Sequence, residues 1–463
     1  MENYNKFVKD SSKKIKKLSN LATRCDTISA DLYEKFKVFR GLRDNKGRGV
    51  VTGLTEISEI NAFKYTENGD RIPIEGECFF RGIPIQEIIA GNSYNGRYGF
   101  EETAYLLLCG KLPNKEELDD FIFLLNGLRK LPDTFLRDVI LKAVSENIMN
   151  AMAKCVLSLY SYDENAEDIS IQNVFTQCLK LIASFPVLAV HSFQAHRYYH
   201  LGKNLKIRNP KPYLSTAENI LYMLRGTGKY TAEEARLLDV CLILHAEHGG
   251  GNNSTFTTRV VTSSGTDTYS AIAAALGSLK GPKHGGANIK VVEMMEDIKA
   301  HVADYSEKEV SAYLRKILAK QAFDGQGLIY GMGHAIYSLS DPRANVLKDM
   351  LFSDNYHFEH TDDFELYQRV YELAPKIIAE TRQLYKGVAV NIDFYTGYIY
   401  RMLHISKELF TPIFAIARIA GWSAHRIEEL TNQSKIIRPA YVAVGERQNY
   451  VTIENRKSSL LKK

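Results

Sequence analysis

Residues 241–288 read CLILHAEHGGGNNSTFTTRVVTSSGTDTYSAIAAALGSLKGPKHGGAN, and the interpretation of the whole chain starts from this stretch. It holds two clusters, HAEHGGG at 245–251 and PKHGGAN at 282–288, and each places a histidine beside glycines at the end of a predicted helix. Glycine permits unusual backbone conformations and lets a ligand approach closely. We therefore expect the two clusters to form one pocket approached from two sides.

The length and composition indicate an ordinary globular protein. The chain has 463 residues, 45% of them hydrophobic and 24% charged, which suffices for a large core and for two domains. The formal net charge of +5 does not by itself indicate a nucleic-acid partner, but it suits an anionic substrate.

The cysteines and the N-terminus bear on the cellular compartment of the protein. The six cysteines lie far apart with no CxxC pair, which favours reduced thiols in a cytoplasmic protein over a disulfide or zinc framework. The lysine-rich N-terminus has no apolar core typical of a secretory signal, so its lysines are interpreted as a solvated helix face. We find no apolar run of 18 residues and expect no membrane span.

The remaining pattern predicts a mainly α-helical fold. Residues 1–40 predict one or two helices. Residues 47–58 and 71–82 have short β-type patterns, and the Asn68-Gly69 turn between them indicates a small hairpin. From about residue 84 the pattern is helical. Helix starts are marked at Ser215, Thr231 and Ser306, each followed three residues later by glutamate, and at Asp341-Pro342. Gly281-Pro282 ends a helix predicted over 267–280.

The first cluster offers a buried histidine. Leu237, Cys241, Leu244 and His248 fall on one face of the helix that begins at Thr231, so His248 should face inward with His245 nearby. A core histidine with satisfied hydrogen bonds is the structural alternative. A metal site of His245, Glu247 and His248 is another, although the order differs from HExxH.

His284 stands between the end of one predicted helix and the start of the next, about 288–300. A helix N-terminus disfavours the imidazolium form, so the pKa of His284 should be lowered and the ring should be a neutral N–H donor. Such a group can polarise a carbonyl and stabilise an enol, as a neutral histidine does in triosephosphate isomerase. A turn histidine bonded to the backbone is the alternative.

Two later segments carry further candidates. Gly331, Met332 and Gly333 precede His334 in a loop that lets a bulky ligand lie against the backbone, although such loops are common. Arg343 opens a helix and can present its guanidinium fork to a carboxylate.

Asp393 follows an apolar run, so desolvation should raise its pKa toward that of a general base; a helix-capping aspartate is the alternative. Arg418 shares a helix face with Phe414, and a buried arginine needs an anionic partner, either a structural acid or a ligand. Arg438 precedes a proline, and this dipeptide means little by itself.

Taken together and in this order, these residues resemble the citrate synthase family. The similar segments are LHAEHGGGNNSTFTTRVV, GPKHGGAN, GMGHAIYSLSDPRA, NIDFYTG, FAIARIAGW and IIRPAYVAVG, within about residues 240–447. The segment CFFRGIPIQEI extends the resemblance toward the N-terminus. GPxHGGAN followed by GxGHxxY and DPR is a highly specific combination.

The resemblance implies a reaction and a role for each matching residue. Acetyl-CoA condenses with oxaloacetate and water, through an enol and a citryl-CoA thioester, to give citrate and CoA. His284 would stabilise the enol, Asp393 would remove the methyl proton, and His334 would bind and protonate the oxaloacetate carbonyl. The other oxaloacetate-binding residues would be His248, Arg343, Arg418 and Arg438. The Gly331–Gly333 loop would contact CoA, and no metal or permanently bound cofactor is implied.

The resemblance also implies an architecture. A small domain of about 286–404 would close over a large domain made of 1–285 and 405–463. Arg438 would reach the active site of the partner subunit in a homodimer. The chain departs from many relatives in having Glu247 where they have aspartate and Ala440 where they have a second arginine, which leaves a C-terminal contact in doubt.

Three alternatives remain open at this point. 2-Methylcitrate synthase would use propionyl-CoA, and its acyl pocket differs by about one methyl group, worth roughly 1–3 kcal/mol. A non-catalytic, ligand-sensing protein could share the fold, but the joint presence of His284, His334 and Asp393 argues against it. A metal-dependent hydrolase would need stoichiometric zinc.

Overall fold

The computed structural model describes residues 2–44, 48–68, 70–94, 96–334, 336–352, 363–382, 388–432 and 435–456. The chain separates into two compact units, one made of Met1–Gly53 and Arg438–Lys463 and the other of Leu54–Ile437. Of the predicted site residues, only Arg438 belongs to the first unit. The predicted division into a large and a small domain concerns the interior of the second unit and remains a prediction.

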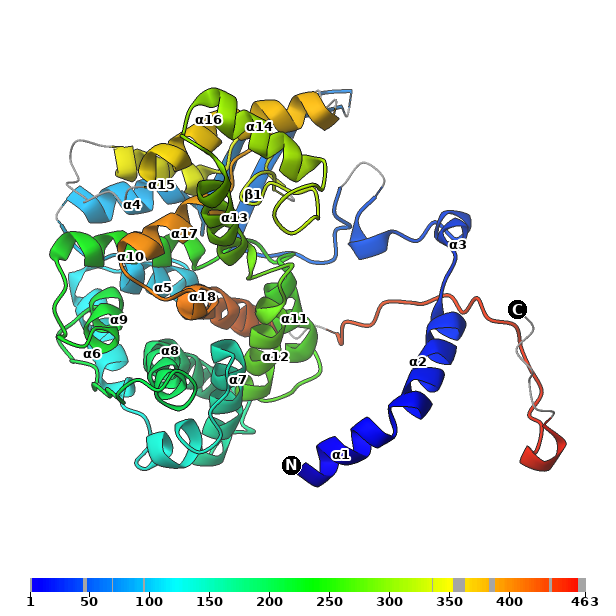
Figure 1. Cartoon of the computed structure of the whole chain (residues 1–463). Helices are drawn as coiled ribbons and strands as arrows, with labels where there is room; N and C mark the ends of the chain where they lie inside the picture. Colours follow the sequence, from blue (N-terminus) through cyan, green and yellow to red (C-terminus); the bar gives the residue numbers. More distant parts are fainter. Residues whose placement is uncertain are drawn as a thin grey trace. The chain divides into compact units, whose positions relative to one another are not determined.

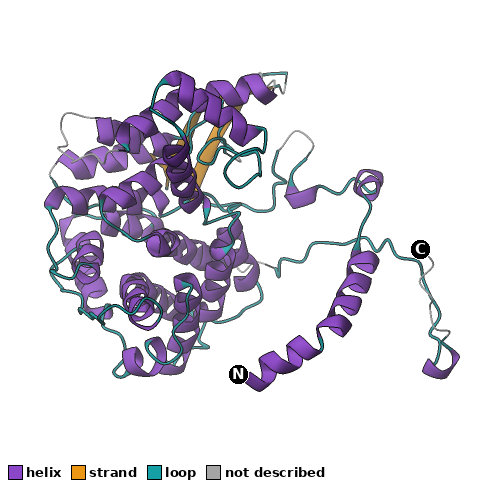
Figure 2. Ribbon diagram, in the orientation of Figure 1, coloured by secondary structure: helices purple, strands orange, loops and turns teal. Residues whose placement is uncertain are grey.

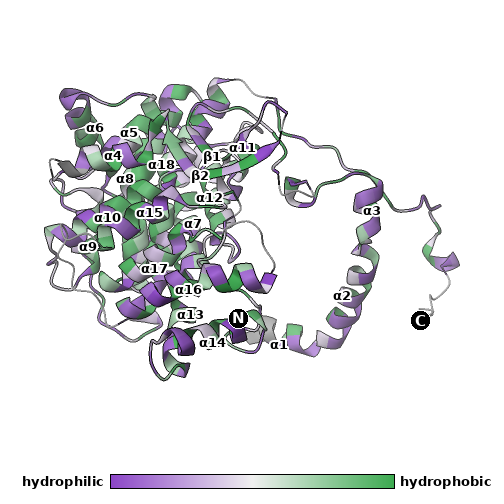
Figure 3. Cartoon of the chain, turned by 90° about the horizontal axis from the view of Figure 1, so that it is seen from above, coloured by the Kyte–Doolittle hydropathy of each residue, from purple (hydrophilic) through white to green (hydrophobic). Residues whose placement is uncertain are grey.

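The first unit contains short helices joined by extended chain. Its elements are α1 (Glu2–Asp10), α2 (Ser12–Asp26), α3 (Ala30–Lys35), η1 (Arg40–Leu42) and η5 (Ile453–Asn455). The sequence predicted one or two helices before residue 40, whereas the structure has three α-helices. Ser11 and Ser29 stand at the N-caps of α2 and α3, positions that serine favours. Figure 3 shows hydrophilic and hydrophobic residues mixed along α2.

The second unit is built mainly from helices, as the sequence predicted (Figures 1 and 2). In chain order its elements are β1 (Ser58–Tyr65), β2 (Arg71–Phe80), β3 (Ile83–Pro84), α4 (Ile85–Tyr94), α5 (Phe100–Cys109), α6 (Lys115–Leu128), η2 (Leu136–Ile140), α7 (Ile148–Leu159), η3 (Tyr160–Tyr162), α8 (Ile171–Tyr199), α9 (Thr216–Leu224), α10 (Ala232–His245), α11 (Asn253–Thr262), α12 (Thr268–Lys280), α13 (Ala287–His301), α14 (Glu307–Leu318), α15 (Pro342–Phe352), α16 (Phe364–Arg382), α17 (Ile392–Met402), η4 (Lys407–Leu409) and α18 (Phe410–Thr431).

The hairpin is confirmed, but its first strand was placed too early. β1 and β2 pair antiparallel from Ser58↔Phe80 to Tyr65↔Arg71, so the turn lies at the Asn-Gly position, of which Gly69 falls outside the described residues. The predicted strand 47–58 is wrong, because 48–57 has no strand partner and β1 begins only at Ser58. β-branched residues favour strands only where a neighbouring strand supplies the hydrogen bonds.

The helix starts and ends that local sequence signals indicate were predicted well. Ser215 and Thr231 each form a complete capping box with the glutamate three residues on. Ser306 accepts a hydrogen bond from the Glu309 N–H, and α15 begins at Pro342 as predicted. The N-cap of α12 is Asp267, and the helix ends at Lys280 before Gly281-Pro282. These signals are reliable because they depend on neighbours within one helical turn.

The helices α8 and α18 form the centre of the core. α18 packs against α8, α10, α5 and α11, and most of its side chains are buried. In Figure 1, α18 lies in the middle of the second unit with α8 and α10 on either side. This central position places the residues of α18 next to the end of α10.

α8 bears on the expectation that the chain has no membrane span. Its 29 residues include an 18-residue stretch with a mean hydropathy of 1.5, which by length and composition could cross a membrane. However, 83% of that stretch is buried inside the protein. No other helix in the described parts of the chain meets the same criteria. Its burial is typical of a helix at the centre of a large core.

Candidate active site

The His245–Gly251 cluster begins where α10 ends. Leu237, Cys241 and Leu244 are buried as predicted, but the helix ends at His245, so His248 is not on its face. The chain instead continues past the helix without regular structure, and the ring of His248 is still only 6% exposed. Burial lowers the pKa of His248 well below its usual value, and the charge of Arg343 lowers it further.

His248 meets a histidine from a distant segment. Its ring centroid lies 5.2 Å from that of His334 and 5.7 Å from that of Tyr337. The His248 Nε2 atom has no hydrogen-bond partner among the described residues. A buried nitrogen of this kind indicates a place where a ligand completes the hydrogen bonding.

Arg418 is a second incomplete group. Its side chain is fully buried on α18, its Nε donates to the His245 carbonyl at 2.7 Å, and its guanidinium lies 4.7 Å from the Phe414 ring centroid. Neither Nη1 nor Nη2 has a hydrogen-bond partner in the described part of the chain. Burial lowers the pKa of Arg418 to about 10, although Glu247 opposes this effect. A buried cation with two nitrogens that have no partner among the described residues has the chemistry that suits a carboxylate.

His284 lies in the turn between α12 and α13, as predicted. Its Nε2 is 3.0 Å from the Ser254 hydroxyl, which also accepts a hydrogen bond from the Trp422 indole at 3.1 Å. Its pKa is lowered to about 4, first by burial and then by the charge of Arg418. The predicted direction is confirmed, and burial and the charge of Arg418 account for it; an effect of the following helix stays a prediction.

Backbone hydrogen bonds join the loop before His334 to the segment before Asp393. Gly331 and Gly333 have φ of +81° and +83°, in the left-handed region that glycine tolerates. The Gly333 N–H donates to the Ala389 carbonyl at 2.7 Å, and the Asn391 N–H donates to the Gly331 carbonyl at 2.9 Å. A Cβ at Gly331 would crowd Phe394. The loop before His334 is thereby fastened to the start of α17.

The orientation of His334 follows from its hydrogen bonds. Its Nδ1 accepts from the backbone N–H groups of Ile336 at 3.1 Å and Tyr337 at 3.2 Å. An accepting Nδ1 places the ring proton on Nε2. The ring also stacks on Tyr337 with a centroid distance of 4.7 Å. His334 can therefore present an N–H donor from a fixed ring.

Arg343 is held differently from what the sequence suggested. Its Nε and Nη2 bind both oxygens of Asp341, at 3.0 and 2.8 Å, and both side chains are buried. Asp341 also accepts from the Ile392 N–H at 3.3 Å, which links this pair to α17. The fork that was expected to face a ligand is thus engaged within the chain, by Asp341.

Asp393 is the second residue of α17. The helix is capped by Asn391, whose side chain accepts from the Asp393 N–H, so Asp393 is not the capping residue. Burial raises the pKa of Asp393 to about 6; Asp341 raises it further, while Arg343 and Arg418 oppose the rise. The prediction that desolvation would raise this pKa is confirmed.

Two other predictions concern residues outside this cluster. Arg438 is exposed and belongs to the first unit. The described residues include no group of three histidine, cysteine, aspartate or glutamate side chains arranged to hold a metal ion. The Glu247 carboxylate of the suggested metal site instead binds His425 Nε2 at 3.1 Å.

Sequence reasoning missed several residues around the site. Ser254 and Trp422 support His284, and Tyr337 supports His334. His425 was also missed, although it lies seven residues after Arg418 and therefore shares its face of α18. That spacing is the one signal in the sequence that could have drawn attention to it.

Comparisons with known proteins agree on one family. The family model "Citrate synthase, C-terminal domain" matches residues 41–440. The citrate synthase of Deinococcus radiodurans is 36% identical over 383 residues, covering 82% of this chain and 93% of the relative. A 2-methylcitrate synthase from Shewanella oneidensis is 33% identical over 379 residues, covering 81% and 91% respectively.

A solved structure shows the same fold. The crystal structure of citrate synthase from Thermotoga maritima superposes with a TM-score of 0.70 at 30% sequence identity. The match covers 89% of this chain and 98% of that one. The similarity therefore spans nearly the full length of the solved protein, including the region of the histidine and arginine cluster.

Proposed function

The chain belongs to the citrate synthase family and is an acyltransferase that converts acyl groups into alkyl groups on transfer, and from this premise we propose how its site acts. The reaction condenses acetyl-CoA with oxaloacetate and water to give citrate and free CoA. The observation that carries this proposal is the buried Arg418 guanidinium beside the histidines, two of whose nitrogens have no hydrogen-bond partner among the described residues. Oxaloacetate has two carboxylates to offer such a group.

Oxaloacetate binds between His248, Arg343 and Arg418. Arg418 takes one carboxylate with Nη1 and Nη2, and the idle Nε2 of His248 takes another oxygen. Arg343 contributes chiefly positive charge, because Asp341 holds its fork. His248, Arg343 and Arg418 are buried, so each of these charge-assisted hydrogen bonds is strong.

Asp393 acts as the base that removes a proton from the thioester methyl group. A pKa of about 6 leaves the carboxylate ionised near neutral pH while keeping it more basic than an exposed aspartate. The lowered pKa of His284 keeps its ring neutral. With Nε2 accepting from the Ser254 hydroxyl, the ring proton lies on Nδ1, which donates a hydrogen bond to the thioester oxygen as the enol forms.

His334 completes the condensation. The enol carbon attacks the carbonyl carbon of oxaloacetate, and the carbonyl oxygen receives a proton from His334 Nε2. The product is a citryl-CoA thioester, which water then hydrolyses to citrate and the CoA thiol. Histidines and arginines supply the stabilising charge throughout, so the proposal assigns no metal or resident cofactor, and acetyl-CoA is a co-substrate.

CoA lies along the Gly331–Gly333 loop. The left-handed glycines let the backbone turn beside His334 without a side chain in the way. Closure of a small domain of about 286–404 over 1–285 and 405–463 would exclude water until condensation has occurred. The anchoring of this loop to the start of α17 supports the proposal, because both segments would then move as one body.

The proposed active enzyme is a cytoplasmic homodimer. Arg438 is exposed within its own chain, which suits a role in the site of a partner subunit. All six cysteines are free thiols, which suits a reducing compartment.

The test is release of free CoA thiol by purified protein given oxaloacetate and either acetyl-CoA or propionyl-CoA at matched concentrations. Faster release from acetyl-CoA is the expected result. Faster release from propionyl-CoA would establish 2-methylcitrate synthase, the activity for which the Shewanella relative is named. Absence of thiol release from both, by folded protein, would favour a ligand-sensing role.

A further inference from the structure

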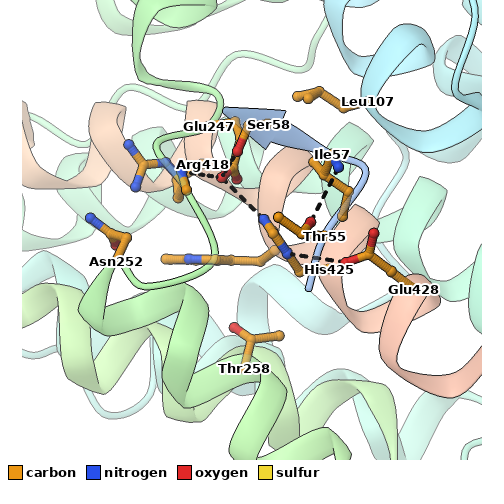
Figure 4. Close-up of polar contacts among 12 residues, drawn as sticks. Thr55, Ile57, Ser58, Leu107, Glu247, Asn252, Thr258, Arg418, His425 and Glu428 are labelled. Carbon is orange, nitrogen blue, oxygen red and sulfur yellow. Dashed lines mark hydrogen bonds and ion pairs between the residues drawn. The ribbon is translucent and has the colours of Figure 1, made fainter. Parts of the chain in front are cut away.

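A second layer of buried charge lies behind the histidine cluster. Glu247, the residue before His248, is fully buried. Its Oε1 accepts three hydrogen bonds, from His425 Nε2 at 3.1 Å, from the Ser58 hydroxyl at 3.0 Å and from the Gly249 N–H at 2.5 Å. Figure 4 shows Ser58 and His425 on either side of this carboxylate. The backbone of Gly249, the residue after His248, is thus hydrogen-bonded to the side chain of Glu247.

The direction of the hydrogen bonds around His425 is determined by its other partner. Arg259 contacts His425 Nδ1 with its Nε at 3.1 Å and its Nη2 at 2.7 Å. A guanidinium can only donate, so Nδ1 accepts and the ring proton lies on Nε2, toward Glu247. Arg259 is held in turn by Glu428 and by Glu429, the latter at 2.8 Å.

The same network extends to the hairpin. Ser58 is the first residue of β1, and the Glu56 N–H donates to the Glu428 carboxylate at 2.7 Å. Three elements that are distant in sequence therefore converge on Glu247: the chain after α10, the start of β1 and the last turns of α18. Such a convergence fixes the position of the carboxylate more firmly than a single ion pair would.

Glu247 also acts on Arg418. Among the charges around Arg418, Glu247 makes the largest contribution that favours the ionised guanidinium. α18 passes so close to this segment that a Cβ at Gly421 would overlap the Glu247 carboxylate and the Ala246 carbonyl. The Gly421 N–H donates to that carbonyl at 3.2 Å. Glycine at 421 therefore permits the close approach that puts Arg418 beside His248.

We propose that Glu247 and His425 are positioning residues for the oxaloacetate half of the site. They hold the 246–249 backbone, and with it the ring of His248, and they supply the opposite charge for Arg418 before substrate binds. Neither touches substrate. The inference rests on the proposed function, because it assumes that oxaloacetate occupies the place between His248 and Arg418.

The test compares two substitutions of His425 by direct calorimetric measurement of oxaloacetate binding. His425→Asn keeps an acceptor near Nδ1 for Arg259 but cannot reach Glu247. His425→Gln places its amide N–H near the position of Nε2 and can still donate to Glu247. We expect His425→Asn to raise the Kd for oxaloacetate about 10-fold or more, since a hydrogen bond to a buried charge is lost. His425→Gln should restore most of that loss, and the KM for acetyl-CoA should change little in both.

A structural control and a milder variant keep the result decisive. His191→Asn alters another buried histidine, on α8, which is bonded to the Arg208 carbonyl at 3.0 Å; it should leave oxaloacetate binding unchanged. If His425→Asn does not fold, Ser58→Ala removes a single neutral donor and should raise the Kd about 2- to 10-fold.

The outcomes distinguish a failure of the proposed function from a failure of the positioning role of Glu247 and His425. A wild-type protein that binds no oxaloacetate would overturn both the proposed function and this inference. Normal binding by the wild type, with equal Kd values for His425→Asn and His425→Gln or an unchanged Kd for Ser58→Ala, would overturn only the inference.

Discussion

Replacement of Arg418 by methionine should make the free protein more stable while destroying its affinity for oxaloacetate. Methionine has nearly the length of arginine and no charge, so it can fill the same space on α18. The guanidinium is fully buried, and two of its three nitrogens have no hydrogen-bond partner among the described residues. A buried charge of this kind costs stability unless a partner compensates it.

The magnitudes follow from the environment of Arg418. A pKa of about 10 in place of 12.5 corresponds to about 3 kcal/mol against the charged form in the empty site. Loss of the hydrogen bond to the His245 carbonyl and of the contact with Phe414 offsets about 1–2 kcal/mol of this gain. We expect the free energy of unfolding to rise by about 1–2 kcal/mol.

Binding should change in the opposite direction. Two hydrogen bonds to a carboxylate, each worth about 1.5–3 kcal/mol, are lost, so the Kd for oxaloacetate should rise by roughly two to four orders of magnitude. Urea unfolding with and without oxaloacetate measures the stability, and calorimetry measures the Kd.

Arg426→Met is the matched control. Arg426 is also fully buried on α18, but its guanidinium donates to Thr262, Thr266 and Thr268. Its loss should lower stability and leave oxaloacetate binding intact. Our reasoning is refuted if Arg418→Met destabilises the protein as Arg426→Met does, or if its affinity for oxaloacetate is unchanged.

The other predictions concern the base, its titration and the dimer. Asp393→Asn should lower kcat by several orders of magnitude while the calorimetric Kd for oxaloacetate stays nearly constant; wild-type turnover would disprove the base assignment. Because the reaction needs the Asp393 carboxylate and burial raises its pKa to about 6, kcat/KM for acetyl-CoA should fall as the pH drops through about 6, and a plateau down to pH 4 would contradict this. Arg438→Ala and Arg418→Ala subunits, each inactive alone, should regain activity when mixed, because one site of the hybrid dimer has both arginines; no recovery would argue against a shared site.

The helices show which structural features can be predicted from adjacent residues. The capping boxes at Ser215 and Thr231 and the proline start of α15 were predicted from a few adjacent residues. The strand predicted at 47–58 failed because its composition was right but no strand pairs with it. Caps are satisfied within one turn, whereas a strand needs a partner that composition cannot identify.

The candidate site shows the same limit. The sequence identified His248, His284, His334, Asp393 and Arg418, because glycines, helix ends and apolar runs flank them. It could not show that Asp341 binds the guanidinium of Arg343. The sequence is equally compatible with a guanidinium that faces a ligand and with one that faces a neighbouring carboxylate. It also missed His425, whose partner Glu247 is 178 residues away along the chain.

The sequence was sufficient to indicate the family, the mainly helical class, many helix starts and the candidate residues for the chemistry. These depend on residue type and on short-range spacing. The tertiary structure alone decided the ring contact between His248 and His334, the idle donors of Arg418 and the pKa values near 4 and 6 at His284 and Asp393. Burial and charge at a site are set by side chains from distant segments, such as Ser58, which reaches Glu247 across 189 residues of sequence.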